Sequence, residues 1–262
     1  MAKKTRIDLL LVERGLVESR SQAQRLIMAG QVRVNDQVVN KSSQKFASNV
    51  QIALESGPRF VSRGGEKLAA ALDAFPVIIE GKICADVGAS TGGFTDCLLQ
   101  AGAARIYAID VGRGVLHWRL RNHPKVVVME GVNARELESL PEPIQLVTID
   151  ASFISLRMLF PKVVGWLVNN GEIIALVKPQ FEAGREDVGK GGVVRDPEVH
   201  QRILKEVIDY AMDHDLGPQA IMISPLRGPR GNREFLLWCI KGLGGVDINT
   251  LLGSLQLPSS TD

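Results

Sequence analysis

Short apolar segments alternate with helical segments from residue 77 onward, and this alternation limits the possible folds more than any other feature. Apolar strands that lie between helices are typical of a mostly parallel sheet with both faces covered. Only a short link precedes the last strand, which predicts that this strand is antiparallel. The sequence therefore predicts an α/β domain with a seven-stranded, mostly parallel sheet. The expected strands are residues 83–87, 106–110, 126–129, 146–150, 173–177, 220–223 and 235–240, and the expected helices are residues 93–101, 156–168 and 198–214.

The first sixty residues have a different pattern. Apolar positions predict one helix over residues 6–14 and a second that begins near Ser19 or Ser21, both good N-cap residues, and ends at Gly30. Residues 32–39 predict a β-hairpin that turns at Asn35-Asp36. We expect a small α+β domain over residues 1–58, a linker over 59–65, the α/β domain over 66–245 and a C-terminal tail over 246–262, frayed at 258–262.

Charge is distributed unevenly along the chain. The first 60 residues contain ten Lys and Arg against five Asp and Glu, so the other 202 contain 21 basic and 24 acidic residues. A basic segment joined to a mildly acidic body suggests that the segment binds a polyanion such as RNA. An ordinary solvated surface is an equally open interpretation of the charge alone. The candidate RNA-binding residues, which can form a basic patch that contacts phosphates, are Arg6, Arg20, Arg25, Arg33 and Lys41.

Several classes of protein are disfavoured. No apolar run approaches the roughly 20 residues that a membrane span needs, and the N-terminal residues lack the features of a signal peptide. The three cysteines are odd in number and include no CxxC pair, which is typical of a reducing compartment. The four histidines lack the spacing of metal ligands, so we propose no metal site. These features lead us to expect a cytoplasmic protein.

A glycine-rich turn follows the first expected strand of the sheet. Ligands bind at this edge of an open α/β sheet, at the carboxyl ends of its strands. Asp110 closes the next strand, where its carboxylate can accept hydrogen bonds from ribose hydroxyls. Asn133 either contacts an adenine or caps the next short helix, and Phe94 lies either near the cofactor or in the core. The candidate cofactor-binding residues are Asp86, Gly88, Ser90, Thr91, Gly92, Gly93, Phe94, Asp110 and Asn133.

Three types of cofactor compete for this turn. Dinucleotide sites prefer GxGxxG, whereas Gly88 is followed here by Ala-Ser-Thr before the next glycines. A phosphate-binding P-loop needs GxxxxGK followed by Ser or Thr, and the one similar segment, residues 184–191, has a glycine at that position. S-adenosylmethionine has no phosphate and needs room for a cationic methionine end near an acid such as Asp86. S-adenosylmethionine therefore fits the turn best.

Several segments resemble a known family. Residues 86–96, 108–113 and 148–156 resemble the FtsJ-like methyltransferase domain, and residues 20–35 resemble the αL RNA-binding motif of a ribosomal protein and of pseudouridine synthases. With residues 60–68 and 176–182 they are similar to the TlyA family, from residue 6 to about residue 241. Members of that family are ribosomal RNA cytidine 2′-O-methyltransferases, although many are labelled hemolysins. The resemblance implies a Rossmann-like class I methyltransferase that uses S-adenosylmethionine and acts on ribosomal RNA or a ribosomal subunit.

The resemblance further implies a catalytic set of two lysines and two acids: Lys67, Asp150, Lys178 and Glu234. Asp150 and Lys178 close the fourth and fifth expected strands, at the ligand-binding edge. We hypothesise that Lys178, with its pKa lowered by burial or by a nearby cation, is the base or polarises the ribose hydroxyl. Lys67 and Asp150 would then fix the ribose. Taken singly, Asp150 as a helix cap and Lys67 as a solvated helix residue are the commoner roles.

Other interpretations stay open. The chain is alternatively a non-catalytic RNA-binding factor for ribosome assembly, or a membrane-active hemolysin, which would need an inserting segment that the sequence lacks. The loop over residues 180–196, rich in glycine and charge, is either a substrate lid or a solvated loop. Phe60 stands where some relatives have Trp, which leaves the pose of the RNA-binding domain open. The modified nucleotide and the oligomeric state are not determined by the sequence.

Overall fold

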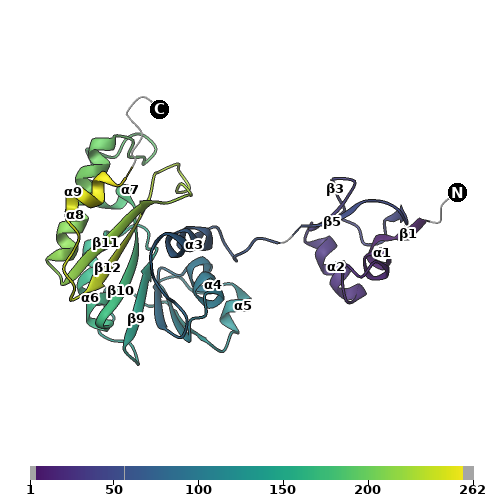
Figure 1. The fold of residues 1–262 in the computed structure, drawn as a ribbon, viewed down its shortest axis with the longest axis horizontal. Coiled ribbons are helices and arrows are strands. Elements are labelled where there is room, and N and C mark those ends of the chain that lie inside the picture. Colours follow the sequence, from purple (N-terminus) through teal and green to yellow (C-terminus); the bar gives the residue numbers. More distant parts are fainter. Residues whose placement is uncertain (1–3, 56, 256–262) are drawn as a thin grey trace. The chain divides into compact units, whose positions relative to one another are not determined.

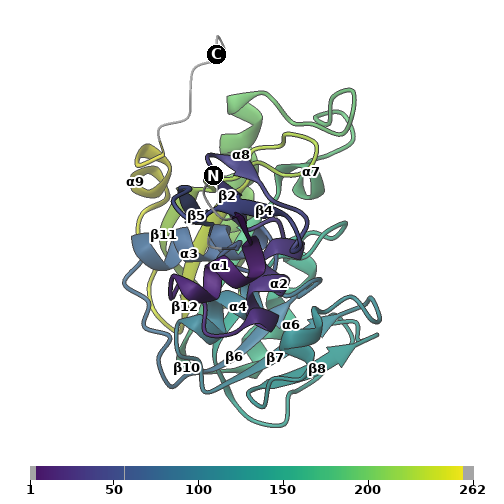
Figure 2. The same ribbon diagram turned by 90° about the vertical axis from the view of Figure 1, so that its right-hand side faces the viewer.

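The computed structural model describes residues 4–55 and 57–255 and divides the chain into two compact units (Figure 1, Figure 2). The first unit spans Met1–Arg59 and the second Phe60–Asp262. Each unit has its own hydrophobic core. Within the described ranges, none of the helices combines the length and the hydropathy that crossing a bilayer requires.

The N-terminal unit packs two short helices against short strands, as its sequence predicts. Its elements are β1 (Lys4–Arg6), α1 (Ile7–Glu13), α2 (Arg20–Met28), β2 (Val32–Val34), β3 (Gln37–Val38), β4 (Lys45–Ala47) and β5 (Ile52–Leu54). Ser19 caps α2, because its hydroxyl accepts a hydrogen bond from the backbone N–H of Gln22 at 3.2 Å. β2 and β3 form the predicted hairpin, and its turn residues Asn35 and Asp36 have positive φ angles of 49° and 63°. Strands β1, β4 and β5 have only three residues each, too few for a periodic pattern in the sequence.

The second unit is built on a seven-stranded sheet in the order β11-β12-β10-β9-β6-β7-β8. Its strands are β6 (Ile83–Val87), β7 (Arg105–Asp110), β8 (Val126–Glu130), β9 (Ile144–Ile149), β10 (Leu167–Val177), β11 (Leu216–Ile223) and β12 (Phe235–Lys241). The last strand lies antiparallel to both β10 and β11, which confirms the predicted antiparallel end of the sheet. Neighbouring residues of one strand enter different cores: Cys84 packs on one face and Ala85 on the other. Burial on both faces explains why the strands are continuously apolar.

Helices cover both faces of this sheet (Figure 1). They are α3 (Gly64–Ala74), α4 (Gly93–Gln100), α5 (Trp118–Arg121), a 3-10 turn at Leu156–Met158, α6 (Phe160–Trp166), α7 (Pro179–Glu182), α8 (Pro197–Met212) and α9 (Ile248–Gly253). α3 and α4 contribute to one core, whereas α6, α8 and α9 contribute to the larger core on the other face. This arrangement leaves the carboxyl ends of β6, β7, β9 and β10 together at one edge.

The structure corrects several predicted boundaries, among them that of the linker, whose last two residues, Gly64 and Gly65, begin α3. The helix expected over residues 156–168 is a 3-10 turn followed by α6, and its last two residues begin β10 because Leu167 has extended backbone angles. The strand expected over 146–150 ends at Ile149, so Asp150 belongs to the loop that follows. The described part of the segment expected as a tail, 246–255, contains α9, whose Leu251 packs in the core. Residues 258–262, expected to be frayed, lie outside the described residues.

Candidate active site

The turn after β6 brings three strand ends together. Gly88 has a φ of +82°, and a Cβ there would lie 2.8 Å from the carbonyl oxygen of Asp150, so only glycine fits this approach. The backbone N–H groups of Gly88 and Ala89 donate to the carbonyl of Ile109 at 2.9 and 3.1 Å. The turn is therefore held between the end of β7 and the residue that follows β9.

A small cavity of about 390 Å³ lies on one side of this turn. Asp110 lines it, and its carboxylate oxygens accept hydrogen bonds from the N–H groups of Ser90 at 2.8 Å and Gly112 at 2.7 Å. Asn133 also lines it, while its side chain donates to Glu136 at 2.8 Å and accepts from the N–H of Arg135 at 3.1 Å. Asn133 therefore lies beside the cavity and starts a turn, not the predicted short helix, and its contact with an adenine stays a prediction.

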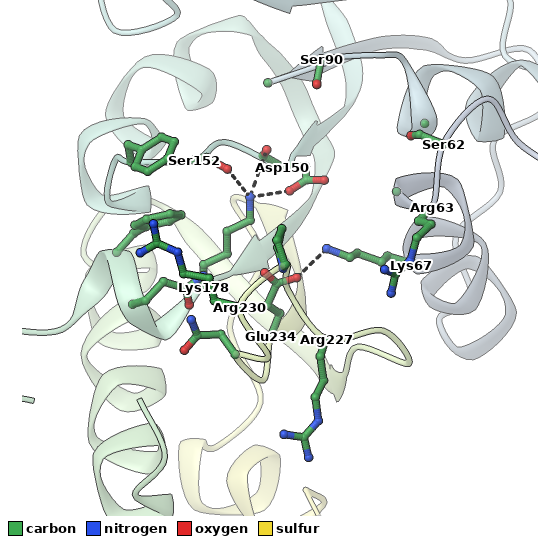
Figure 3. A pocket seen from close by; sticks show the side chains of 18 of the residues that line it. Ser62, Arg63, Lys67, Ser90, Asp150, Ser152, Lys178, Arg227, Arg230 and Glu234 are labelled. Carbon is green, nitrogen blue, oxygen red and sulfur yellow. Dashed lines mark hydrogen bonds and ion pairs between the residues drawn. The ribbon is translucent and has the colours of Figure 1, made fainter. Parts of the chain in front are cut away.

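A larger cavity of about 670 Å³ lies on the other side of the turn and contains all four predicted catalytic residues. They form two lysine–carboxylate pairs (Figure 3). The Nζ atom of Lys178 lies 2.6 Å from Oδ1 of Asp150, and that of Lys67 lies 2.5 Å from Oε2 of Glu234. The structure therefore brings together four residues that span 167 positions of the sequence.

Lys178 is the most enclosed cation of the cavity, with 7% of its side chain exposed. Besides the carboxylate of Asp150, its amine donates to the hydroxyl of Ser152 at 2.9 Å and to the carbonyl of Asp150 at 3.3 Å. An ammonium has three N–H bonds, and each finds an acceptor here. Asp150 is 21% exposed, so the pair is open to the cavity on the carboxylate side.

The loop that carries Asp150 and Ser152 is fixed from the far side by a buried acid. Glu182, at the end of α7, accepts hydrogen bonds from the hydroxyl of Ser155 at 2.5 Å and from the N–H of Leu156 at 2.8 Å. Because α7 follows Lys178 directly, Glu182 ties the two segments that carry the Lys178–Asp150 pair. Burial raises the pKa of Glu182.

Phe153 stands out in the same loop. Its side chain is 88% exposed, and its φ of +64° is uncommon for an aromatic residue. It lines both cavities, and its ring centroid lies 5.1 Å from that of Phe181. The backbone conformation therefore holds an aromatic face at the cavity mouth.

Two of the predicted cofactor residues line neither cavity. Asp86 is fully buried, and its carboxylate accepts from the hydroxyls of Thr95 at 2.6 Å and Thr148 at 3.1 Å. Burial raises the pKa of Asp86 to about 7. Gly92 has a φ of +96°, and a side chain there would collide with Leu120. The other predicted residues that line a cavity are Gly88, Ser90, Thr91, Gly93, Phe94, Asp110 and Asn133.

The predicted RNA-binding residues all lie in the N-terminal unit. Arg6 and Arg20 both contact Asp8, a fully buried carboxylate that sequence inspection missed. Arg33 contacts Glu55 at 2.5 Å and the carbonyl of Asp36 at 2.8 Å. Arg25 and Lys41 are exposed, and neither has an ion pair within the described part of the chain.

Other residues of the larger cavity were also missed, because loops carry no periodic signal in a sequence. They include Ser62, Arg63, Ser152, Phe153, Arg227 and Arg230. Among the described residues, no cluster of His, Cys, Asp and Glu is arranged to hold a metal ion.

The two cavities fit one elongated ligand. Gly88, Ser90, Asp150, Ser152 and Phe153 line both, so the cavities adjoin at the turn. Their volumes lie in the range of small-molecule sites. A nucleoside can place its ribose hydroxyls near the free lone pairs of the Asp110 carboxylate in the small cavity. A linked amino-acid end would then lie at the turn, beside the lysines of the large cavity. S-adenosylmethionine has this shape.

Comparisons with known proteins agree with this site. The family model of FtsJ-like methyltransferases matches residues 60–241, and that of the S4 domain matches residues 5–52. YqxC of Bacillus subtilis, provisionally named an rRNA methyltransferase, is 47% identical over 257 residues, which are 94% of this chain and 90% of that protein. The 16S/23S rRNA (cytidine-2′-O)-methyltransferase TlyA of Mycobacterium tuberculosis is 45% identical over 245 residues, 91% of this chain and 90% of that protein.

A solved structure covers both units. It comes from a Streptococcus thermophilus protein named as a hemolysin, with 39% identity and a TM-score of 0.72 over 97% of this chain and 96% of that one. The chain therefore belongs to the TlyA family, in which an S4 domain precedes an FtsJ-like methyltransferase domain that takes its methyl group from S-adenosylmethionine.

Proposed function

We propose that this enzyme methylates the ribose 2′-hydroxyl of a cytidine in ribosomal RNA. One observation carries the proposal: two lysine–carboxylate pairs share the cavity that adjoins the nucleoside-sized cavity at the Gly88 turn. A ribose hydroxyl is a weak nucleophile that has to be oriented and to lose one proton. Enclosed pairs of amines and carboxylates can both orient the hydroxyl and accept its proton. The names of the relatives support cytidine and ribosomal RNA as the acceptor.

The cofactor supplies a methyl group already activated by its cationic sulfur. On the protein side, we assign its ribose to Asp110, its adenine to the surroundings of Val111 and Asn133, and its methionine end to the turn at Gly88 and Ser90. The oxygens of Asp110 each retain a lone pair beyond the bonds from Ser90 and Gly112. Asp86, buried behind the turn, supports Thr95 and Thr148 and makes no direct contact in this assignment.

We assign proton removal to Lys178. To act as a base, Lys178 has to give up one of the three N–H donors described above. The resulting amine would accept the hydroxyl proton as the methyl group is transferred, and Asp150 at 2.6 Å would stabilise the ammonium that forms. The weakest of its present bonds, 3.3 Å to the carbonyl of Asp150, is the one that the incoming hydroxyl replaces. Lys67, fixed by Glu234, orients the ribose. Base assistance of this kind contributes about 10²–10⁴-fold.

We assign contacts with the RNA substrate to the ring of Phe153 and to the S4 domain. An exposed ring at the cavity mouth offers a stacking surface for an unstacked base. The basic S4 domain would grip the surrounding RNA through phosphates. An enzyme that acts on ribosomal RNA works where ribosomes are assembled, which makes the cytoplasm its proposed location.

The decisive experiment maps 2′-O-methyl groups in ribosomal RNA after incubation with the protein and S-adenosylmethionine. The parent should add one methyl group at defined cytidines of RNA from cells that lack the enzyme. Lys178→Ala should lose methyl transfer by at least about 100-fold while keeping cofactor affinity by calorimetry. Lys205→Ala, an exposed lysine on α8, is the matched control.

Three outcomes would contradict the proposal. Methylation of a base atom would exclude the ribose hydroxyl as acceptor. Full transfer by Lys178→Ala would exclude Lys178 as base. A parent protein that binds ribosomal RNA but not S-adenosylmethionine would favour a non-catalytic assembly factor.

A further inference from the structure

Three arginines line the larger cavity outside its lysine–carboxylate pairs. Arg63, Arg227 and Arg230 are all exposed. Within the described ranges, none of the three has a carboxylate at ion-pair distance. Arg227 donates one hydrogen bond, to the carbonyl of Gly231 at 3.3 Å. Guanidinium groups that have no carboxylate partner and line a cavity are available to an anionic ligand.

The charge of the cavity is larger than the cofactor requires. Five cationic and two anionic side chains line it, an excess of three positive charges: Arg63, Lys67, Lys178, Arg227 and Arg230 against Asp150 and Glu234. S-adenosylmethionine carries one carboxylate beside its cationic sulfur and its ammonium group, so it can pair with at most one of the three excess cations. The excess therefore indicates a second ligand that is anionic and lies on the lysine side of the cavity.

The positions of the arginines suit a ligand that passes over the catalytic pairs. Arg63 is the N-cap residue of α3 and lies one helical turn before Lys67. Arg227 and Arg230 lie on the loop between β11 and β12, just before Glu234. In Figure 3, Arg63 and Arg230 lie on opposite sides of the Lys67–Glu234 pair, and Arg227 lies below it.

The loop that carries Arg227 and Arg230 is held in shape. Its ends are joined by a hydrogen bond from the N–H of Gly228 to the carbonyl of Asn232 at 2.9 Å. Asn232 is buried, and its side chain donates to the carbonyl of Gly192 at 2.8 Å and accepts from the N–H of Val194 at 3.0 Å. These bonds also join this loop to the segment over residues 180–196, so the loop that carries both arginines is ordered by its own contacts.

We propose that Arg63, Arg227 and Arg230 bind the phosphodiester groups on either side of the ribose that is methylated. The inference rests on the proposed function, since it takes RNA as the acceptor. Each ribose in RNA lies between two phosphates, and guanidinium groups bind phosphate through paired N–H bonds. Such contacts hold the backbone and do not depend on the base. They place the 2′-hydroxyl over Lys178 whichever nucleotide follows the target.

The first test measures how salt affects the methylation of ribosomal RNA from cells that lack the enzyme. Arg63→Gln, Arg227→Gln and Arg230→Gln are compared with Lys205→Gln, which removes an exposed charge from α8, outside the cavity. Each arginine variant should flatten the slope of log kcat/KM against log salt by about 0.7 per lost phosphate contact. Arg230→Lys keeps the charge and should keep the slope. Cofactor affinity, measured by calorimetry, should not change and reports an intact fold.

A second test removes the charge from the RNA instead. Once the target has been mapped, an RNA with a neutral methylphosphonate on each side of it replaces the parent RNA. The parent enzyme should lose roughly tenfold in kcat/KM, and the triple glutamine variant should lose little more on this RNA than on the normal one. Equal, independent losses from the two changes would overturn the proposal, as would unchanged salt slopes in all three single variants. If the parent itself adds no 2′-O-methyl group, the proposed function fails first.

Discussion

Both units contain ion pairs between carboxylates and basic side chains, but the basic side chains of the two units differ in how far they are exposed. In the N-terminal unit, Asp8 is fully buried and contacts Arg6 and Arg20, which stay 34% and 52% exposed. In the methyltransferase unit, Asp150 and Glu234 contact lysines that are only 7% and 12% exposed. The same kind of ion pair leaves the cation at the surface in the first unit, which we call a displayed pair, and encloses it in the second, which we call a confined pair.

The choice of cation explains the difference. Arg20 bonds Asp8 through Nε alone, so neither of its terminal nitrogens is used in that pair. Lys178 has one nitrogen, and all three of its N–H bonds point at Asp150 and Ser152. A guanidinium can thus bind a carboxylate and still have N–H donors for a ligand. The single amine of a paired lysine has no donor left over. Arginine therefore suits the RNA contacts that we propose for the first unit, and lysine suits the proposed site of methyl transfer.

The largest expected effect comes from breaking a confined pair. Glu234→Ala leaves the Lys67 ammonium without its counter-charge, which should cost about 3 kcal/mol of unfolding free energy and at least about 100-fold in methyl transfer. Lys67→Met combined with Glu234→Leu should regain the stability but not the activity. Urea unfolding and single-turnover methylation provide the two measurements. A double variant that regained both would show that the pair is structural only.

Breaking the ion pairs of Asp8 should weaken RNA binding and destabilise the first unit, but leave the cofactor site unchanged. Asp8→Asn leaves Arg6 and Arg20 without their anchor, and we expect roughly tenfold weaker binding of ribosomal RNA with unchanged cofactor affinity. The substitution also removes a negative charge, so charge alone predicts tighter binding. Asp36→Asn removes an exposed acid from the same unit and should show that tighter binding. If Asp8→Asn behaved like Asp36→Asn in a filter-binding titration, Asp8 would not position the arginines.

The buried aspartates of the two units should respond to pH with opposite signs. Burial raises the pKa of Asp86 to about 7, so its stabilising contribution is complete below about pH 4 and is lost as the pH rises to 7. The hydrogen bonds from Arg6 hold the pKa of Asp8 well below its usual range. Its contribution is therefore present above about pH 4 and is lost as the pH falls further.

The difference in unfolding free energy between the parent and an Asp→Asn variant reports the contribution of that one aspartate. The stability difference between parent and Asp86→Asn should fall from pH 4 to pH 7, by on the order of 1 kcal/mol or more. The difference between parent and Asp8→Asn should be flat over that range. All three tryptophans lie in the second unit, so their fluorescence follows that unit, and circular dichroism of the whole chain adds the first. A flat Asp86 curve would contradict the raised pKa.

The smallest effect separates an anchored arginine from a free one within the same helix. Arg25 has no ion pair in the part of the chain that the structure describes, whereas Arg20 is held by Asp8. Arg25→Ala should weaken RNA binding about threefold at moderate salt and lower the salt slope by about one contact. Arg20→Ala should cost more, because a free side chain loses more entropy on binding. If both variants lost RNA affinity equally, the ion pair with Asp8 would give Arg20 no advantage in binding RNA.

Elements with many residues in one pattern could be predicted from the sequence. Strand β6 was predicted with its exact ends, 83–87, because it is a short apolar run followed by a glycine turn. Strand β10 was predicted with only its last five residues, 173–177, because Asn169 and Asn170 interrupt the apolar run. Asp150 was placed in a strand that ends one residue earlier, since hydrogen bonding and not composition decides where a strand stops.

The amino-acid sequence alone determined the seven strands of the main sheet in their chain order, the glycine turn at the sheet edge and the uneven charge, because these depend on neighbours in the chain. Only the tertiary structure decided which charges meet. Lys67 and Glu234 are 167 residues apart, and nothing local indicates that they touch. Asp86 looked like a cofactor ligand and is buried between two threonines, while Asp8 looked unremarkable and anchors two arginines. Burial and pairing are properties of packed surfaces, which form only after distant segments have folded together.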